Sequence, residues 1–145
     1  MMLTRRSRWD KEFAHDVAEA RWVVDHLVPA ATDRSLPAAQ VSEQWLDGKR
    51  RLDDLQSDLY RLGTAAPNSE RAARLGSVSG ALAALQESLQ SDVALRSAAP
   101  TAAAPDAEAD GARELDASFQ QVTHRRDTLI AVLEGRTPGA AHAAP

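Results

Sequence analysis

The pair Glu12 and His15 comes closest to metal chemistry in this 145-residue sequence. A Glu and a His three positions apart lie on one helix face, and di-iron carboxylate bundles combine two such pairs with two further Glu residues. The nearest second copy is Gln121 with His124, and glutamine lacks the negative charge that such a site needs. His15 also falls about 160° from the centre of the apolar face of its predicted helix. We therefore expect neither a metal site nor a cofactor.

A second stripe on the same predicted helix consists of His15, Glu19, Trp22 and His26. The two histidines are three helical turns apart, roughly 16 Å along the axis, which is too far to share one ion. Trp22 lies almost opposite the apolar face, although tryptophan is costly to leave in water and is enriched in binding hot spots. The stripe indicates one of three things: packing of Trp22 on the fourth helix, the linker or the N-terminal arm, a surface for a protein partner or a second copy, or a small-molecule pocket.

Arg126 occupies an apolar position of the last predicted helix, between Val122 and Leu129. A buried arginine needs a carboxylate partner or a route to solvent. Asp16 and Asp92 lie at the edges of the apolar faces of their helices, so each is a candidate buried partner. The alternatives are an arginine that reaches solvent at the edge of the bundle, a polar residue that sets the register, or a ligand contact.

The net charge argues against nucleic-acid binding, and the lack of catalytic motifs argues against an enzyme. The net charge is -4 and the pI is about 5.5, so general attraction to nucleic acid is not expected, although Arg5, Arg6 and Arg8 form a small basic arm. The sequence contains no glycine-rich phosphate loop, no Gly-x-Ser-x-Gly motif and no recognisable catalytic triad. We therefore expect a protein that is not an enzyme.

The apolar residues predict helices. The sequence has 29 Ala and 16 Leu against 9 Val and one Ile, a strong bias toward helix formers. Apolar residues at spacings of three and four predict helices over residues 7–28, 37–62, 69–96 and 111–134, the first ended by Pro29. None of these helices can bury its stripe alone. They predict an all-α fold, a single four-helix bundle over residues 1–135.

The second and third helices carry the most regular patterns. The second has an a/d series typical of coiled-coil-like packing, formed by Val41, Trp45, Gly48, Leu52, Leu55, Leu59 and Leu62. The third has a core stripe of Leu75, Val78, Leu82, Leu85, Leu89 and Val93. A line of small residues beside that stripe, which includes Gly76 and Gly80, predicts a groove where another element approaches closely. Gly48 likewise predicts close approach of a backbone or a large ring.

The fourth helix is separated from the others by a long Ala/Pro-rich linker, residues 97–110. Its predicted inward residues are Leu115, Phe119, Val122, Leu129, Ile130 and Leu133. Its direction relative to the third helix stays open, because a linker of this length can cross a short bundle. Residues 136–145 are expected to be a disordered tail.

No apolar run approaches the ~20 residues of a membrane span, and Asp10 and Glu12 stand where a signal peptide would need apolar residues. We therefore expect a cytoplasmic protein with no membrane contact. The function that we expect is that of a non-enzymatic interaction or scaffold protein, with a homodimer through the face around Trp22 as one form. The alternative is a ligand-binding or regulatory domain with a pocket near Trp45 and Gly48. A nucleic-acid-associated protein is the third reading.

Overall fold

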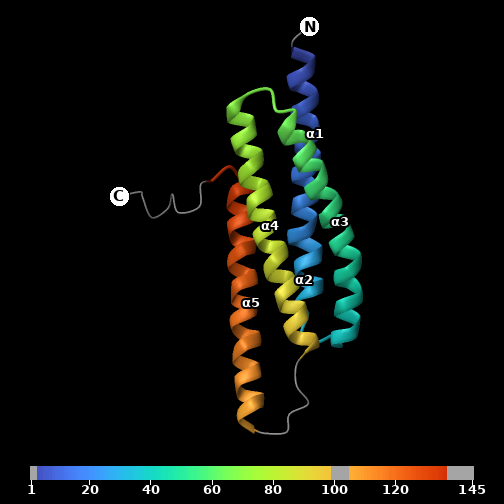
Figure 1. Ribbon diagram of the computed structural model, residues 1–145, viewed down its shortest axis with the longest axis vertical. Helices are drawn as coiled ribbons and strands as arrows, with labels where there is room; N and C mark the ends of the chain where they lie inside the picture. The colour runs from blue at the N-terminus through green and yellow to red at the C-terminus, as the bar shows by residue number, and fades with distance from the viewer. Residues whose placement is uncertain (1–2, 99–104, 137–145) are drawn as a thin grey trace, which may run out of the picture.

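The computed structural model describes residues 3–98 and 105–136, and it contains no strand among them. Helix α1 (Leu3–Trp22) continues through a π-helical turn, η1 (Val23–Leu27), into the short helix α2 (Val28–Ala31). It is followed by α3 (Ala38–Thr64), α4 (Ser69–Ser97) and α5 (Pro105–Leu133). Because α1, η1 and α2 form one rod, the described chain is an all-α bundle of four helical rods that run alternately up and down (Figure 1). The predicted fold class is confirmed.

The core is built on the hairpin of α3 and α4. Every predicted inward residue of α3, from Val41 to Leu62, is buried, and so is every predicted core residue of α4, from Leu75 to Val93. Trp9, Phe13 and Trp45 join them as large fillers. Helix α4 begins where the Asn68 side chain accepts a hydrogen bond from the Arg71 backbone amide at 2.9 Å, an ordinary N-cap. Repeated aliphatic stripes were thus sufficient to identify this half of the bundle.

The prediction that Pro29 ends the first helix is wrong. Proline has no N–H, and its ring clashes with the carbonyl one turn earlier in an α-helix. Here the preceding turn is widened into η1, in which the Val28 amide donates to the Val23 carbonyl, five residues back. Pro29 then sits in the first turn of α2, where no N–H is required. Val23 and Val24, the first two residues of this turn, are both buried.

Gly48 on α3 is the point where the first rod approaches most closely. A Cβ atom built on Gly48 would lie 2.2 Å from Leu27 Cδ1, far inside van der Waals contact. The close neighbour that the sequence predicted is therefore the Leu27 side chain rather than a backbone or a large ring. Leu27 is buried, and it fills the space beside Gly48.

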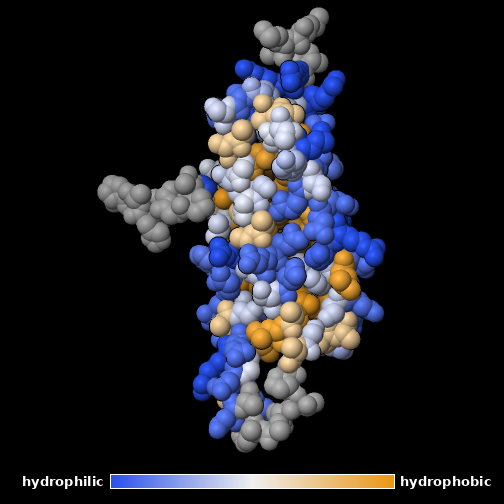
Figure 2. Space-filling view, viewed as in Figure 1, coloured by the Kyte–Doolittle hydropathy of each residue, from blue (hydrophilic) through white to orange (hydrophobic). Residues whose placement is uncertain are grey.

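The predicted close-approach groove on α4 is wrong. Gly76 and Gly80 are exposed, and a Cβ atom added to either would meet nothing within 4 Å. Both glycines lie outside the contact with α3, on a side of α4 where Figure 2 shows pale and orange residues among the blue ones. Small side chains on an exposed helix face cost little, so spacing alone did not distinguish a packed face from a bare one.

Helix α5 runs antiparallel to α4 and starts earlier than predicted, at Pro105 instead of residue 111 (Figure 1). Of the predicted linker, residues 99–104 lie outside the described residues, and 105–110 are helical. Most of the predicted tail, residues 137–145, is also outside them. Val122, Leu129 and Leu133 are buried as expected, but Phe119 is 42% exposed. It lies near the end of the bundle, where α5 has few neighbours.

Among the described residues, no helix combines the length and the apolar character needed to cross a bilayer.

Replacing Gly48 with Ala should destabilise the protein. The new methyl group forces Leu27 to move, at a cost of about 1–3 kcal/mol, which outweighs the gain of about 1 kcal/mol in helix propensity. Gly80→Ala is the matched control on an open helix face and should stabilise the protein by roughly 0.5–1 kcal/mol. Urea unfolding of both variants measures the difference. Equal stabilisation by both substitutions would show that Leu27 does not require a glycine.

Candidate functional site

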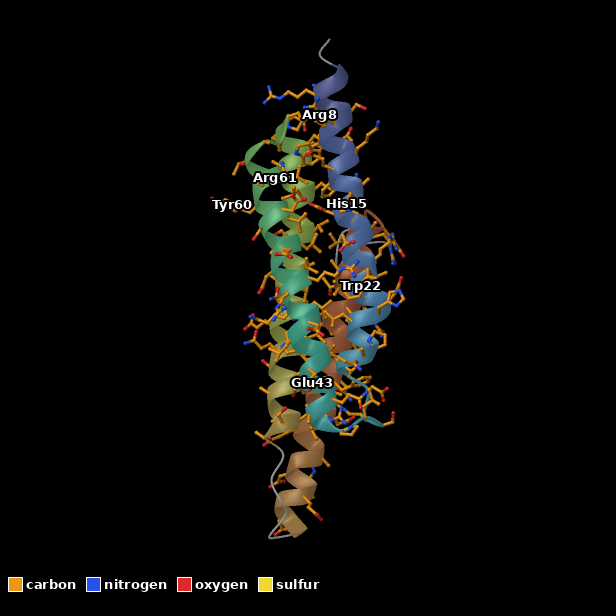
Figure 3. All side chains as sticks on the ribbon, turned by 90° about the vertical axis from the view of Figure 1, so that its right-hand side faces the viewer. Arg8, His15, Trp22, Glu43, Tyr60 and Arg61 are labelled. Carbon is orange, nitrogen blue, oxygen red and sulfur yellow. The ribbon has the colours of Figure 1, made fainter. Side chains whose placement is uncertain are left out.

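The seam between α1 and α3 contains the predicted stripe of His15, Glu19, Trp22 and His26. We call the surface formed by these four residues and Arg51 the α1/α3 seam. His15 and Trp22 follow each other along the first rod on this side of the molecule (Figure 3). Trp22 is half-buried and packs against the edge of the core, His15 is exposed, and the ring of His26 lies 5.9 Å from that of Trp22. The stripe is therefore partly buried and partly exposed to solvent.

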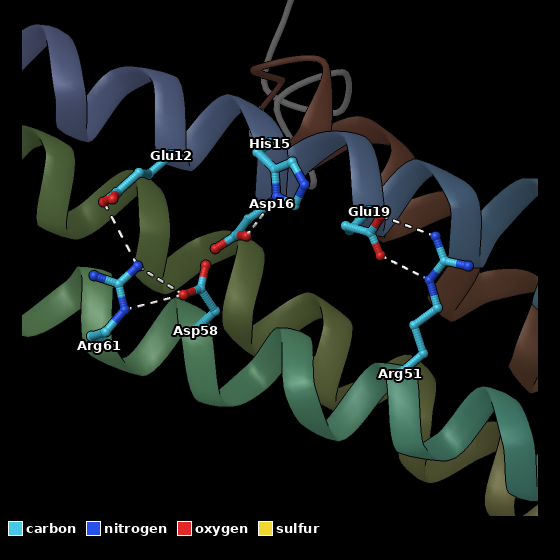
Figure 4. Close-up of polar contacts among 7 residues, drawn as sticks. All are labelled: Glu12, His15, Asp16, Glu19, Arg51, Asp58 and Arg61. Carbon is cyan, nitrogen blue, oxygen red and sulfur yellow. Dashed lines mark hydrogen bonds and ion pairs between the residues drawn. The ribbon is translucent and has the colours of Figure 1, made fainter.

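Arg51 of α3 covers Trp22. Its guanidinium carbon lies 3.7 Å from the centre of the indole ring, within the range of a cation–π contact. Two hydrogen bonds hold it there, from Arg51 Nε to Glu19 Oε2 at 2.8 Å and from Arg51 Nη2 to Glu19 Oε1 at 3.0 Å (Figure 4). The Glu19 carboxylate raises the pKa of Arg51, and Arg51 lowers the pKa of Glu19. The described contact of Trp22 is with Arg51 of α3, which is not among the elements that the sequence suggested.

Asp16 of α1 is buried and faces Asp58 of α3 (Figure 4). Its Oδ2 atom is buried without a hydrogen-bond partner among the described groups, and the ring Nδ1 of His15 lies 3.6 Å from its Oδ1. On the other side, Arg61 donates to Asp58 Oδ1 from Nη2 at 2.8 Å and from Nε at 3.1 Å. Two carboxyl groups thus meet between the helices, and arginine neutralises one of them.

Burial raises the pKa of the Asp16 carboxyl to about 7, and the neighbouring Asp58 contributes to the increase. The pKa of Asp58 moves in the opposite direction, first because it accepts a hydrogen bond from Asp16 and then because of Arg61. Below about pH 7 the Asp16 carboxyl therefore keeps its proton, while the Asp58 carboxyl beside it is ionised. Above neutral pH this proton is lost, and two negative charges face each other in a nearly dry position.

Glu12 takes part in this cluster through Arg61, at 3.7 Å between Glu12 Oε2 and Arg61 Nη2. It does not form a metal site with His15. Among the described residues, no three His, Asp or Glu side chains are placed so that they could hold a metal ion.

Arg126 does not enter the core, and neither predicted carboxylate meets it. Its side chain is 36% exposed and pairs with the adjacent Asp127 at 3.0 Å. Asp92 is fully buried, but Arg34 binds it with both arms of the guanidinium group, at 3.1 Å from Nη1 and 2.9 Å from Nη2. Arg34 lies in the connection between α2 and α3, so no helical pattern could identify it. Asp16, the other candidate, faces Asp58.

A groove between α1 and α4 lies at the opposite side of the first rod. Trp9 and Phe13 stack at its base, with ring centres 5.2 Å apart, and Trp9 Nε1 donates to the Leu62 carbonyl at 2.9 Å. Its rim carries charges from both helices, among them Asp10, Arg71 and Arg74. We call this surface the α1/α4 groove. The sequence marked Trp9 and Phe13 as core and gave no sign that a groove lies above them.

Similarity to known proteins does not assign either surface a role. No family model matches the sequence, and no curated protein or solved structure is significantly similar to it. The chemistry of the described surfaces is that of charge pairing, stacking and one retained carboxyl proton.

Replacing Arg34 with Ala should cost roughly 3–5 kcal/mol of stability, because it leaves the buried Asp92 carboxylate without its partner. Arg126→Ala removes the same kind of side chain from an exposed pair and should cost less than about 1 kcal/mol. Chemical unfolding of the two variants compares them directly. Similar losses would mean that Arg126 is as important to the core as Arg34.

The pH dependence of stability tests the retained proton of Asp16. Between the ordinary pKa of 3.8 and about 7, the folded chain keeps the Asp16 proton that the unfolded chain has lost. The free energy of unfolding therefore falls as pH rises through this range, by up to about 1.4 kcal/mol per unit. Asp16→Asn cannot ionise, so its stability relative to the wild type should increase from pH 5 to about 7 and then level off.

The control for this measurement is Asp54→Asn, which removes an exposed carboxylate from the same helix as Asp58. Its stability should run parallel to that of the wild type across the pH range. Parallel curves for Asp16→Asn as well would contradict the retained proton.

Proposed function

We propose that this chain is a non-enzymatic interaction protein that binds a protein partner through the α1/α3 seam. The observation that carries the proposal is the Arg51 guanidinium held flat on Trp22 by Glu19. Tryptophan and arginine are the side chains most enriched among the residues that dominate protein interfaces. Here both are presented together on one surface.

The arrangement is rigid before any partner arrives. Trp22 rests on the core, and Arg51 is fixed by a two-bond pairing with Glu19, so little side-chain entropy remains to be lost on binding. His26 extends the aromatic surface beside Trp22. A partner that covers this surface would exclude water from the Arg51–Glu19 ion pair and so strengthen its hydrogen bonds.

A ligand-binding role near Trp45 and Gly48 has less support. Trp45 is buried, and Leu27 occupies the space beside Gly48 that a ligand would need. An enzymatic role has no support in the described surfaces either, because the retained proton of Asp16 lies between two packed helices and away from the grooves described above.

Site-specific cross-linking tests the proposal in the native host. A photo-reactive phenylalanine analogue is placed at Ala18, an exposed position of the first rod between His15 and Trp22, and in a second variant at Ala83 on α4. Adducts are expected from position 18 and not from position 83. A product of twice the chain mass identifies a second copy as the partner, and any other mass identifies a different protein.

Adding Trp22→Ala to the position-18 variant should weaken binding by about 2 kcal/mol, roughly thirty-fold in affinity. The adduct should then be largely lost. No adduct at position 18, the same adducts from both positions, or an adduct indifferent to Trp22→Ala would each refute the proposed face.

A further inference from the structure

Helix α5 is displaced along the bundle relative to the other three rods. Figure 1 shows its first turns extending beyond the end of α4, while its last turn stops well short of the connection between α3 and α4. The Leu115 carbonyl accepts a hydrogen bond from Arg34, which lies in the connection at this end of the bundle. Residues 105–114 therefore extend past the bundle as a single helix, roughly 15 Å long. We call this segment the α5 overhang.

The displacement leaves a vacancy at the other end. A fourth helix would there cover α1 and α4, but α5 has ended, and the α1/α4 groove lies open above Trp9 and Phe13. The backbone at Gly135, with a φ of 78°, turns out of the helical direction after Leu133. The molecule thus has three rods at one end and one projecting helix at the other.

The two ends carry opposite charge. On the overhang and the turn after it, acidic side chains outnumber basic ones by five to one: Asp106, Glu108, Asp110, Glu114 and Asp116 against Arg113. The described side chains of residues 106–114 are exposed except for the half-buried Gly111, and the lower end of α5 is blue in Figure 2. A helix that is polar on all sides gains nothing from its own bundle and has no described neighbour to pack against.

The groove end is basic. Arg5, Arg6, Arg8 and Lys11 line the start of α1, and Arg71 and Arg74 extend from α4. The hydrogen bond from Arg71 lowers the pKa of Asp10, and the charges of Arg6 and Arg74 lower it further. The groove lining itself balances Asp10 and Glu70 against Arg71 and Arg74, so the excess of positive charge at this end comes from the start of α1. Arg74 lies 5.4 Å above the Phe13 ring and makes no ion pair within the described part of the chain. It is therefore available to a carboxylate from outside.

We propose that copies of this chain stack end to end, with the acidic α5 overhang of one copy lying along the α1/α4 groove at the basic end of the next. The overhang offers only small groups between its charges, such as Ala109, Gly111 and Ala112, which allow its backbone to approach the rim of the groove closely. From Trp9 to Val17, α1 provides roughly 12 Å of groove wall, which accommodates most of the length of the overhang.

This contact is heterologous, because the two surfaces lie at opposite ends of the molecule. Each copy keeps one free groove and one free overhang after pairing, so the assembly grows as an open chain and does not stop at a dimer. Successive α5 helices come into line, so that the negative C-terminal end of one faces the positive N-terminal end of the next. The inference is independent of the partner proposed for the α1/α3 seam, which lies on another side of the first rod.

Sedimentation velocity over a range of protein concentrations measures the assembly. At about 25 mM salt the wild type should show a ladder of species that grows with concentration, and at about 500 mM salt it should return to monomer, because screening weakens exposed charge pairs. Arg74→Glu should weaken association at least tenfold. Arg50→Glu, the same charge change at an exposed position of α3 away from both ends, is the matched control and should leave it unchanged.

A second variant removes the overhang charges through Asp106→Asn, Glu108→Gln and Asp110→Asn, with Asp25→Asn, Asp47→Asn and Asp54→Asn as the exposed control. The overhang variant and Arg74→Glu should each be monomeric alone. The first keeps a working groove and the second a working overhang, so a mixture should form one-to-one pairs and nothing larger. This outcome is specific to a head-to-tail contact.

Circular dichroism and a thermal melt establish that each variant is folded, so that loss of assembly is not loss of structure. A wild type that stays monomeric at low salt and high concentration overturns the proposal. So does association that survives both sets of substitutions, or a mixture that assembles beyond pairs. Binding of a short DNA duplex by a monomeric wild type, lost in Arg74→Glu, would also overturn it and assign the basic end to nucleic acid instead.

Discussion

The contact of Leu27 with the bare backbone of Gly48 sets how the first helical rod lies along α3. No side chain separates the two helices at this point, so the rod settles where Leu27 fits, and the π-helical turn before Pro29 supplies the rotation that Leu27 needs. At the far end, the Trp9 indole donates to the Leu62 carbonyl and fixes the same pair of elements a second time. Everything along the α1/α3 seam follows from these two anchors, because they decide which residues of the two helices become neighbours.

Two buried aspartates illustrate two ways of tolerating a carboxyl group inside a bundle. Asp92 is bound by both arms of the Arg34 guanidinium group, which reaches it from a connection between helices. Asp16 has no such arginine, and it is accommodated by keeping its proton beside Asp58. The guanidinium group of Arg34 keeps its positive charge at any ordinary pH. The proton on Asp16 is lost as the pH rises, so the packing of α1 on α3 responds to pH.

The four rods of the bundle do not overlap along their whole length, because α5 is displaced along the other three. Because α5 is displaced, its first turns project at one end of the molecule with their charged side chains, and the α1/α4 groove lies at the other end. Four rods pack against one another in the middle. The aliphatic stripes of α3 and α4 are continuous and buried over the length of both helices. The ends and the seam contribute less to that core, and these are the surfaces that remain for binding.

The sequence by itself determined the helical class, the four stripes and the complete core sets of α3 and α4, because burial of apolar residues at three-four spacing is a local property of a helix. It also singled out Trp22, Asp16 and Asp92 as departures from that pattern. Their neighbours were decided by the tertiary structure alone: Arg51, Asp58 and Arg34 lie 29, 42 and 58 residues away from them. Periodicity places a residue on a face, but only the packing of one helix on another decides what that face meets. The same reason applies to the displacement of α5, since a helix pattern specifies a buried stripe without specifying where along its neighbour the stripe will lie.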